Sequence, residues 1–343
     1  MKRSKILEAI RIDEFSSTLK YQQLGNSVLE GIKKGIIKKG DMMPSINEVS
    51  FEFNISRVTV EKGYNYLKNL GVLDSVPGKG YFIKSNETSQ DLKIFLLFNK
   101  LSTHKKILYD SLVEALGDKA AIDFYIYNND INLFLRLIAD RKHDYTHFVI
   151  IPHFYDCQDK AYRIIDTLPK DKLILVDKAI PQVTGEYGAV YENFEQDIYK
   201  SLKQASEALS KYTELAIIFP ENSYFPSEIT KGFINFCRDF AFEHRIIHSL
   251  ENEDIKEGTA YINLMENDLV NLIDKVMEKN FILGQQVGII SYNETPLKRL
   301  ILNGITTIST DFNIMGKTTA RLILDNSKEH IENPFNIRLR PSL

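Results

Sequence analysis

The side chains that could do chemistry in this sequence fall into two groups. The first is a basic stretch near the N-terminus, in which Ser56 is followed by Arg57, Val58 and Thr59 and, one turn later, by Lys62. Arginine and lysine side chains on the exposed face of a helix can pair with phosphate oxygens. The second group consists of polar residues that directly follow short apolar runs farther along the chain.

Patterns typical of catalysis or of metal binding are absent from the sequence. It contains no G-x-S-x-G, no G-x-x-x-x-G-K-[ST] and no G-x-G-x-x-G after the first apolar run. His244 and His248 lie in a strand-like run that lacks the glutamate of H-E-x-x-H, which argues against zinc. Cys157 and Cys237 stand alone, as in a reducing compartment. We therefore expect no catalytic residue, no metal and no cofactor. The alternative is a C-terminal enzyme that acts on a small metabolite.

The spacing of apolar residues predicts three helices and a hairpin in the first 84 residues. Leu24, Val28, Ile32 and Ile36 recur every four residues and predict the first helix. Ser45 and Glu48 form a capping-box pattern that opens a second, short helix. Ser56 can cap a third helix, which ends at Gly71. Two strand-like runs, at 72–76 and 81–83, flank a turn that contains Gly78 and Lys79. This order predicts a winged helix-turn-helix that presents the start of its third helix to DNA.

The same stretch resembles the DNA-binding domain of GntR-family transcription regulators. The family elements G-D-x-x-P-S, S-R-x-T-V and G-x-G-x-F correspond to residues 40–45, 56–60 and 78–82. The resemblance implies that Arg57 and Thr59 contact DNA, with Ser56 and Val58 close by and Lys79 on the wing. The positions expected at the DNA interface are Ser45, Asn47, Ser56, Arg57, Val58, Thr59, Lys62, Gly78 and Lys79.

The sequence departs from the family at two positions that would face DNA. Asn47 stands where the family usually has arginine, and Glu61 stands where a second arginine is frequent. Both differences remove a cation from the DNA-facing surface. We therefore expect modest affinity and a base preference of its own, with Lys62 as partial compensation.

The two parts of the chain carry opposite charge. Residues 1–84 have 14 Lys and Arg against 9 Asp and Glu, a net formal charge of +5, whereas the remainder has 29 against 37, or −8. A basic head on an acidic body is typical of a DNA-binding protein with a separate regulatory domain. A polar stretch that begins at residue 84 separates them, so we place a DNA-binding domain at 1–84, a linker at 85–91 and a second domain at 92–343.

The second domain alternates strand-like and helix-like segments, which predicts an α/β fold with two lobes of parallel sheet and a cleft between them. The expected strands lie at 94–98, 122–127, 147–152, 172–177, 189–192, 215–220, 244–250, 259–264, 286–292 and 305–309. Ligands of such sheets bind beyond the carboxyl ends of the strands. The candidates to bind an effector are Asn99, Tyr127, His153, Asp177, Asn267, Asp268, Tyr292 and Asn293. The tyrosines can stack on a sugar ring, and Asp and Asn can bind its hydroxyls.

This domain also resembles the LacI-type effector domain, which is similar to periplasmic sugar-binding proteins. The resemblance rests on Val176-Asp177-Lys178, on residues 288–296 and on residues 304–324. It implies that Asp177 and Asn293 hold sugar hydroxyls, with Asn267 or Asp268 as a further contact. The segment 227–233, SEITKGF, lacks an arginine that sugar-responsive members often carry, so the identity of the ligand is open.

Together these patterns predict a transcription regulator that binds double-stranded operator DNA, as a homodimer, and responds to a small effector, a sugar. The gene targets would be those of carbohydrate uptake or catabolism. No apolar run reaches the length of a transmembrane helix, and the N-terminus lacks the apolar stretch of a secretory signal. We expect a cytoplasmic protein without membrane contact.

Overall fold

The computed structural model describes residues 4–76, 80–86, 92–139, 145–155, 158–221 and 223–343. Its contacts divide the chain into two compact units. The first comprises Met1–Phe98, Leu116–Asn128 and Asn132–Ile150, and the second comprises Asn99–Ala115, Asn129–Ile131 and Ile151–Leu343. Among the described residues, no helix combines the length and the apolar character that crossing a bilayer requires.

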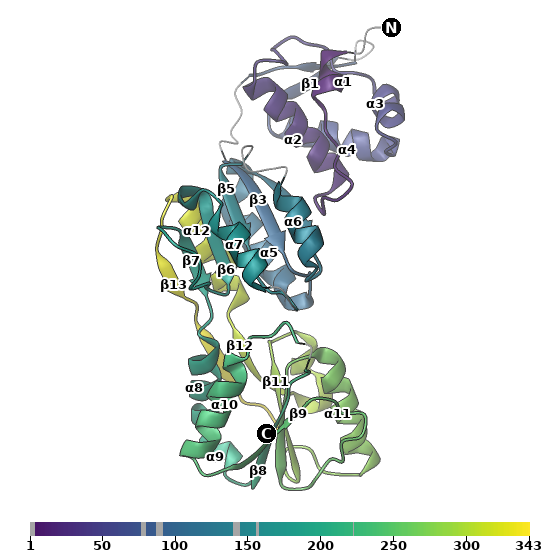
Figure 1. Cartoon of the computed structure of the whole chain (residues 1–343). Coiled ribbons are helices and arrows are strands. Elements are labelled where there is room, and N and C mark those ends of the chain that lie inside the picture. Colours follow the sequence, from purple (N-terminus) through teal and green to yellow (C-terminus); the bar gives the residue numbers. More distant parts are fainter. Residues whose placement is uncertain (1–3, 77–79, 87–91, 140–144, 156–157, 222) are drawn as a thin grey trace. The chain divides into compact units, whose positions relative to one another are not determined.

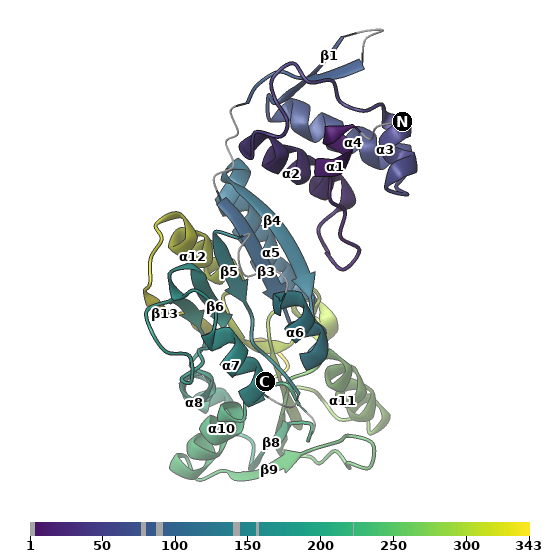
Figure 2. The same cartoon turned by 45° about the horizontal axis from the view of Figure 1, so that its top comes forward.

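The N-terminal part forms the predicted winged helix-turn-helix (Figures 1 and 2). Its elements are α1 (Lys5–Ala9), α2 (Lys20–Lys33), α3 (Ile46–Glu52), α4 (Arg57–Asn69), β1 (Leu73–Val76) and β2 (Gly80–Ile83). The strands β1 and β2 pair antiparallel, with Leu73 opposite Ile83. The wing tip, with Gly78 and Lys79, lies outside the described residues.

Two serine caps fix where the helices of this head begin. Ser45 accepts a hydrogen bond from the Glu48 backbone N–H at 3.2 Å, while the Glu48 carboxylate accepts one from the Ser45 backbone N–H at 2.8 Å. This is the predicted capping box. Ser56 caps α4 through the Thr59 N–H at 3.1 Å. Behind the caps, Leu24, Val60 and Leu67 are fully buried in the core of the head.

The segment between α1 and α2 runs along strand β4 (Ala120–Ile126), which belongs to the same compact unit. The Ser17 backbone N–H donates to the Phe124 carbonyl at 2.6 Å, and the Phe124 N–H donates to the Thr18 hydroxyl at 2.7 Å. The Lys93 ammonium pairs with the Glu30 carboxylate at 2.8 Å. The first unit thus joins elements of the head and of the α/β region by backbone and side-chain contacts.

The α/β region confirms the predicted fold class, with two six-stranded sheets of order β13-β7-β6-β5-β3-β4 and β14-β12-β11-β10-β8-β9. Its remaining strands are β3 (Leu92–Phe98), β5 (His147–Ile150), β6 (Leu173–Asp177), β7 (Gly188–Tyr191), β8 (Glu214–Ile218), β9 (Glu243–Ile247), β10 (Thr259–Asn263), β11 (Val287–Tyr292), β12 (Thr306–Thr310), β13 (His330–Glu332) and β14 (Phe335–Arg338). Within these two sheets, each pair whose strands lie in the same unit is parallel except that between β12 and β14.

Helices connect these strands, as the alternating pattern predicted. They are α5 (Thr103–Leu116), α6 (Ile131–Ala139), α7 (Gln158–Asp166), α8 (Phe194–Gln204), α9 (Ser206–Leu209), α10 (Glu228–Asp239), α11 (Glu266–Glu278) and α12 (Phe312–Leu324). Four short 3-10 turns accompany them: η1 (Gly117–Lys119), η2 (Lys170–Lys172), η3 (Leu297–Arg299) and η4 (Ile301–Asn303). All ten expected strands are present, and α1, β13 and β14 are among the elements that were not expected.

Helices α8 and α10 run side by side in both views (Figures 1 and 2), and a glycine permits their close approach. A Cβ atom on Gly232 would lie 2.1 Å from the carbonyl oxygen of Glu195 and 2.7 Å from Ile198. The obstacle at 2.1 Å is backbone, which cannot rotate away as a side chain can. Only glycine fits at this crossing without moving one of the two helices.

We expect Gly232→Ala to lower the free energy of unfolding by about 1 to 3 kcal/mol, because overpacking a close helix contact outweighs the better helix propensity of alanine. Denaturant-induced unfolding followed by circular dichroism measures the change. The control is Lys231→Ala, an exposed position on the same helix, which should change stability by at most about 0.5 kcal/mol. A Gly232→Ala variant as stable as the wild type would contradict the close-approach argument.

Candidate functional site

The first turn of α4 carries the side chains that the sequence assigned to DNA. Ser56 is the N-cap, Arg57, Val58 and Lys62 are exposed, and Thr59 is half-buried with its hydroxyl 2.8 Å from that of Ser56. The opposite face of α4 points into the core through Val60, Tyr64 and Leu67. Tyr64 is fixed by a hydrogen bond from its hydroxyl to the Pro44 carbonyl. Helix α4 is therefore packed against the head through one face, and its other face is exposed.

The cations on this outer face are available to a phosphate backbone. Within the described part of the chain, neither Arg57 nor Lys62 makes a hydrogen bond or an ion pair with its side chain. Ser45 and Asn47, at the start of α3, are exposed as well. The described part of the predicted DNA-facing surface is thus exposed on the head, and Gly78 and Lys79 cannot be placed on it.

A second site lies in the second compact unit, where the connections that follow β6 and β11 meet. A small cavity of about 30 Å³ is lined by Lys100, His104, Lys105, His153, Asp177, Glu192, Phe194, Tyr224, Phe225, Pro226, Tyr292, Asn293 and Phe312. An adjoining cavity of about 190 Å³ is lined by Lys100, Ser102, His104, Tyr224, Phe225, Leu264, Met265, Glu266, Asn267, Tyr292, Asn293 and Lys298. We call them the deep cavity and the adjoining cavity. Six residues line both, so the two form one continuous site.

The centre of the deep cavity is a buried carboxylate, that of Asp177. Its Oδ2 accepts a hydrogen bond from His153 Nε2 at 2.9 Å and lies 3.2 Å from Lys105 Nζ. All three side chains are at least 93% buried. Burial would raise the pKa of Asp177, but the charge of Lys105 and the contact with His153 outweigh it and hold that pKa below its usual range. The carboxylate and the ammonium form an ion pair in the interior.

Glu192 completes this cluster in its neutral form. Burial and the negative charge of Asp177 raise the pKa of Glu192 well above its usual range, so the carboxyl is protonated and hydrogen-bonds to Asp177. The Tyr292 hydroxyl donates to Glu192 Oε2 at 3.4 Å. Burial lowers the pKa of His153, and burial followed by the charge of Lys105 lowers the pKa of His104 to about 3. Both imidazoles are therefore neutral, and the cluster carries no net charge.

Asp177 and Asn293 both have a left-handed backbone. Their φ angles are 76° and 64°, in a region that Asn and Asp enter more readily than other residues with a side chain. Such conformations cost free energy and collect at functional sites, where the surrounding structure enforces them. Here the Asp177 carbonyl accepts the Glu192 backbone N–H at 3.1 Å. Each strained residue lies at the carboxyl end of its strand, β6 or β11.

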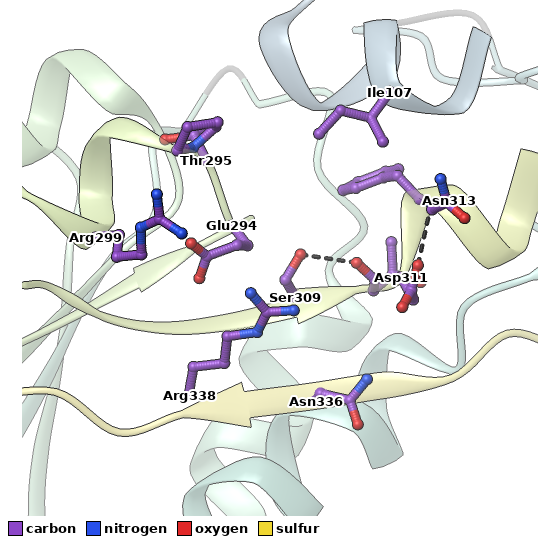
Figure 3. Close-up of a pocket in the computed structure, with 12 residues that line it drawn as sticks. Ile107, Glu294, Thr295, Arg299, Ser309, Asp311, Asn313, Asn336 and Arg338 are labelled. Atoms are coloured by element: carbon purple, nitrogen blue, oxygen red, sulfur yellow. Dashed lines mark hydrogen bonds between the residues drawn. The ribbon is translucent and has the colours of Figure 1, made fainter. Parts of the chain in front are cut away.

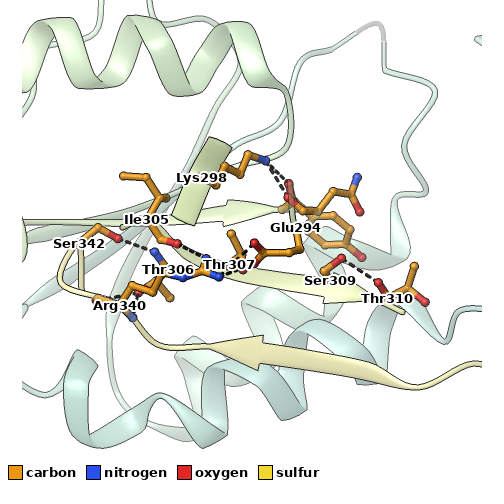
Figure 4. Close-up of polar contacts among 11 residues, drawn as sticks. Glu294, Lys298, Ile305, Thr306, Thr307, Ser309, Thr310, Arg340 and Ser342 are labelled. Atoms are coloured by element: carbon orange, nitrogen blue, oxygen red, sulfur yellow. Dashed lines mark hydrogen bonds and ion pairs between the residues drawn. The ribbon is translucent and has the colours of Figure 1, made fainter. Parts of the chain in front are cut away.

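A polar network holds Asn293 in place, and Figure 4 labels its members Lys298, Glu294 and Arg340. The buried Lys298 ammonium donates to the carbonyl oxygens of Tyr292 at 2.9 Å and of Asn293 at 2.7 Å. The Asn293 backbone N–H donates to the Ile308 carbonyl at 2.8 Å. Next to it, the Arg340 guanidinium pairs with both oxygens of Glu294, at 2.9 and 3.0 Å. The side chain of Asn293 is left to face the cavities, 3.5 Å from His104 Nε2.

The structure brings five of the eight predicted effector residues to these cavities. His153, Asp177, Tyr292 and Asn293 line the deep cavity, and Asn267 lines the adjoining one. Asn99 lies behind them, where its side chain bonds to Lys105 and Asn129. Tyr127 is fully buried and packs edge-on against Phe134, and Asp268 lies in the first turn of α11. The last three line neither cavity.

Sequence reasoning missed several residues of the site, above all Lys100, Lys105 and Glu192. Glu192 directly follows β7, so the rule that directed attention to strand ends would have found it. Lys100 follows β3 by two residues, whereas Lys105 lies on the first turn of α5. No local pattern marks Lys105, because a lysine on an amphipathic helix is usually solvated.

A larger cavity of about 370 Å³ lies near β12 and β14 (Figure 3). Its carboxylates are already engaged, since Asp311 caps α12 through the backbone N–H groups of Asn313 and Ile314, and Glu294 pairs with Arg340. Its arginines, Arg299 and Arg338, are exposed. None of the eight predicted effector residues lines it. The deep and adjoining cavities are therefore the better candidate site.

Comparison with known proteins identifies the head. Residues 20–83 match the family of bacterial regulatory proteins called the gntR family. The chain is 32% identical over 106 residues to the HTH-type transcriptional repressor YtrA of Bacillus subtilis, a match that covers 31% of this chain and 78% of YtrA. It is 31% identical over 101 residues to the mannosyl-D-glycerate transport/metabolism system repressor MngR of Escherichia coli. That match covers 28% of this chain and 42% of MngR, less than half of its length.

Solved structures match the other part of the chain. The trehalose repressor from Escherichia coli aligns with a TM-score of 0.61 at 12% identity, over 73% of this chain and 100% of that one. A LacI family transcriptional regulator from Enterococcus faecalis with bound ribose aligns with a TM-score of 0.59 at 18% identity, over 73% of this chain and 98% of that one. At such identity the likeness shows the fold. The chain therefore belongs to the GntR family of bacterial transcription regulators and carries a domain of the LacI-type fold.

Proposed function

We propose that this regulator controls genes of carbohydrate uptake or catabolism and binds a monosaccharide-type effector in the deep and adjoining cavities. The observation that carries the proposal is the buried polar cluster around Asp177, set opposite Asn293. Lys105 on α5 and His153, Asp177 and Glu192 at or after strand ends are all buried and line one cavity. Buried polar groups are costly unless paired, and gathered at strand ends they mark a site rather than a core.

The chemistry of the lining fits a polyhydroxylated molecule. Asp177 offers acceptors, Asn293 offers both an acceptor and donors, and the neutral His104 offers one of each. Tyr224 and Phe225 stack on each other with ring centroids 4.5 Å apart, and Tyr292 lies edge-on to Phe225. These rings can cover the apolar face of a sugar. The names of MngR and of the ribose-bound neighbour support a carbohydrate.

On the DNA side, the proposed contacts are those of α3, α4 and the wing. They comprise Ser45, Asn47, Ser56, Arg57, Val58, Thr59, Lys62, Gly78 and Lys79. We infer a homodimer on a near-palindromic operator, with half-sites about one helical turn apart, or roughly 34 Å. The division into a head at 1–84, a linker at 85–91 and an effector domain at 92–343 is part of this proposal. We expect the protein in the cytoplasm, where its DNA target lies.

The effector acts only through its different affinities for the two states of the regulator. A ligand that joins Asp177 to Asn293 favours the state in which the ends of β6 and β11 are close. The binding free energy for DNA then changes by the same amount as DNA changes the binding free energy for the effector, because coupling between two sites is reciprocal. Screening monosaccharides for thermal stabilisation of the purified protein tests the proposal, because a bound ligand raises stability in proportion to the logarithm of its concentration.

We expect Arg57→Ala to weaken operator binding by about 1 to 3 kcal/mol, the usual value for losing a base contact from a recognition helix. The operator is first selected from random-sequence DNA with the wild-type protein, and affinities are then measured by fluorescence anisotropy. Arg238→Ala, an exposed arginine on α10, is the control and should bind DNA like the wild type. Unchanged affinity in Arg57→Ala would remove this residue from the interface.

We expect Asn293→Gly to weaken the best monosaccharide of the screen about tenfold or more, because ligand hydroxyls lose a buried partner worth about 1 to 3 kcal/mol. Glycine accepts the left-handed backbone of this position, so the fold is kept. Asn280→Gly makes the same change at an exposed residue with φ 56°, and calorimetry should find its ligand affinity unaltered. Equal affinity in both variants would exclude Asn293 from the site.

A further inference from the structure

The adjoining cavity adds a second unpaired cation to the site. Lys105 is matched by Asp177, Glu192 and the histidines are neutral, and the Lys100 side chain lines both cavities. The charged side chains that line the adjoining cavity beyond this cluster are Lys100, Lys298 and Glu266. Glu266 is exposed to solvent, whereas Lys298 is 2% exposed and Lys100 is half-buried. The interior of the adjoining cavity is therefore lined by two cations and no buried anion.

Neither lysine has a carboxylate partner among the described residues. Lys298 Nζ donates to two carbonyl oxygens, those of Tyr292 and Asn293, and an ammonium group has a third hydrogen to donate. Lys100 Nζ donates to the Tyr224 hydroxyl and lies 4.3 Å from the centroid of the Tyr224 ring. These contacts are to neutral groups. Both lysines keep hydrogen-bonding capacity that the protein does not use.

The two charges are unfavourable as they stand. Burial and then the charge of Lys105 lower the pKa of Lys100 to about 8, and burial lowers the pKa of Lys298 to about 8. The negative charge of Glu266 acts in the opposite sense on both lysines, and that of Glu294 on Lys298, although neither carboxylate makes an ion pair with them among the described residues. Lys100, Lys298 and His104 all line the adjoining cavity. A neutral ligand would bury these ammonium groups further without pairing them, which costs free energy. An anionic group on the ligand would accept hydrogen bonds from both ammonium groups, and it would have no hydrogen of its own to compete with theirs.

We propose that the effector carries an anionic group, a carboxylate or a phosphate, that lies in the adjoining cavity against Lys100 and Lys298. Its hydroxyl-bearing part then lies in the deep cavity against Asp177 and Asn293. This inference rests on the proposed function and narrows it from sugars in general to acidic or phosphorylated sugars. Lys100 is the residue whose mutation tests the preference for an anionic ligand, because Lys298 also holds the backbone of Asn293.

Matched sets of probes test the inference by calorimetry on the full chain. D-glucose, D-galactose and L-arabinose are compared with D-glucuronate, D-galacturonate, L-arabinonate and the phosphate esters of the same three sugars. We expect at least one anionic probe to bind about tenfold or more tightly than its neutral parent, as for a buried charge-assisted contact. The uronate, aldonate and phosphate arms separate a carboxylate from a phosphate.

The variant Lys100→Met removes the charge but keeps an unbranched apolar side chain. It should abolish the preference for the anionic probe, measured as the ratio of the affinities of this variant for the anionic probe and for its neutral parent. Lys106→Met, an exposed lysine on α5, should change neither affinity. In the wild type, the preference should be full below about pH 8 and fall above it, because the free lysines lose their protons there.

Two results overturn the inference in distinguishable ways. A neutral sugar that binds more tightly than all of its anionic counterparts would exclude the anionic group but support a carbohydrate effector. A preference for the anionic probe that persists in Lys100→Met would equally remove the proposed subsite. Absence of binding by every probe of both classes would contradict the carbohydrate effector itself, and this inference with it.

Discussion

The α/β domain is organised around one electrostatic constraint, the burial of the Asp177 carboxylate. A buried charge is tolerated only when it is paired and hydrogen-bonded. Lys105, His153 and Glu192 meet that requirement, from the start of α5, the segment that begins at Ile151 and the residue after β7. Because the cluster needs all of these contributions at once, the elements that carry them must meet where they do. The strained backbone of Asp177 is a consequence of the same demand.

On the proposed function, the two cavities would recognise different parts of the effector. Around Asp177 the charges are balanced, so this part of the site would select a ligand by the placement of its hydrogen-bond donors and acceptors. Lys100 and Lys298 make no ion pair with a buried carboxylate of the described residues, so that part would select by charge. A site of this kind rejects a ligand that lacks the expected group, because its own buried polar atoms are then left without a partner. Specificity then depends on the hydrogen-bonding groups of the site that the protein itself does not pair.

Much of this arrangement follows from local sequence, and the rest does not. The caps at Ser45 and Ser56 and all ten expected strands were predictable, because capping and alternating apolar runs act over a few residues. Asp177 and Asn293 were predicted as site residues because each lies at the carboxyl end of a strand, and both line the deep cavity although β6 and β11 belong to different sheets. Tyr127 satisfies the same rule, yet its ring turns into the core. Helix α1 and strands β13 and β14 are short, and tertiary contacts rather than strong local patterns define them. The role of Lys105 depends on a partner 72 positions away, which no periodicity reveals.

The contacts that hold Asn293 and Asp177 in place limit how a ligand bound to them can change the structure. Asn293 is tied to β12 through Ile308, and through Lys298 to Ile305, whose backbone N–H donates to the Lys298 carbonyl at 2.7 Å. The C-terminal residues lock the same strands, since the Ser342 hydroxyl accepts from the Thr306 N–H and donates to the Ile289 carbonyl, each at 2.7 Å. Asp177 is held by the Lys105 ammonium and by hydrogen bonds with the neutral His153 and Glu192. Neither residue can follow a ligand by local loop movement. On the proposed function, a molecule that contacts both residues therefore changes the distance between the ends of β6 and β11. A displacement of whole strands can be passed on to the rest of the domain.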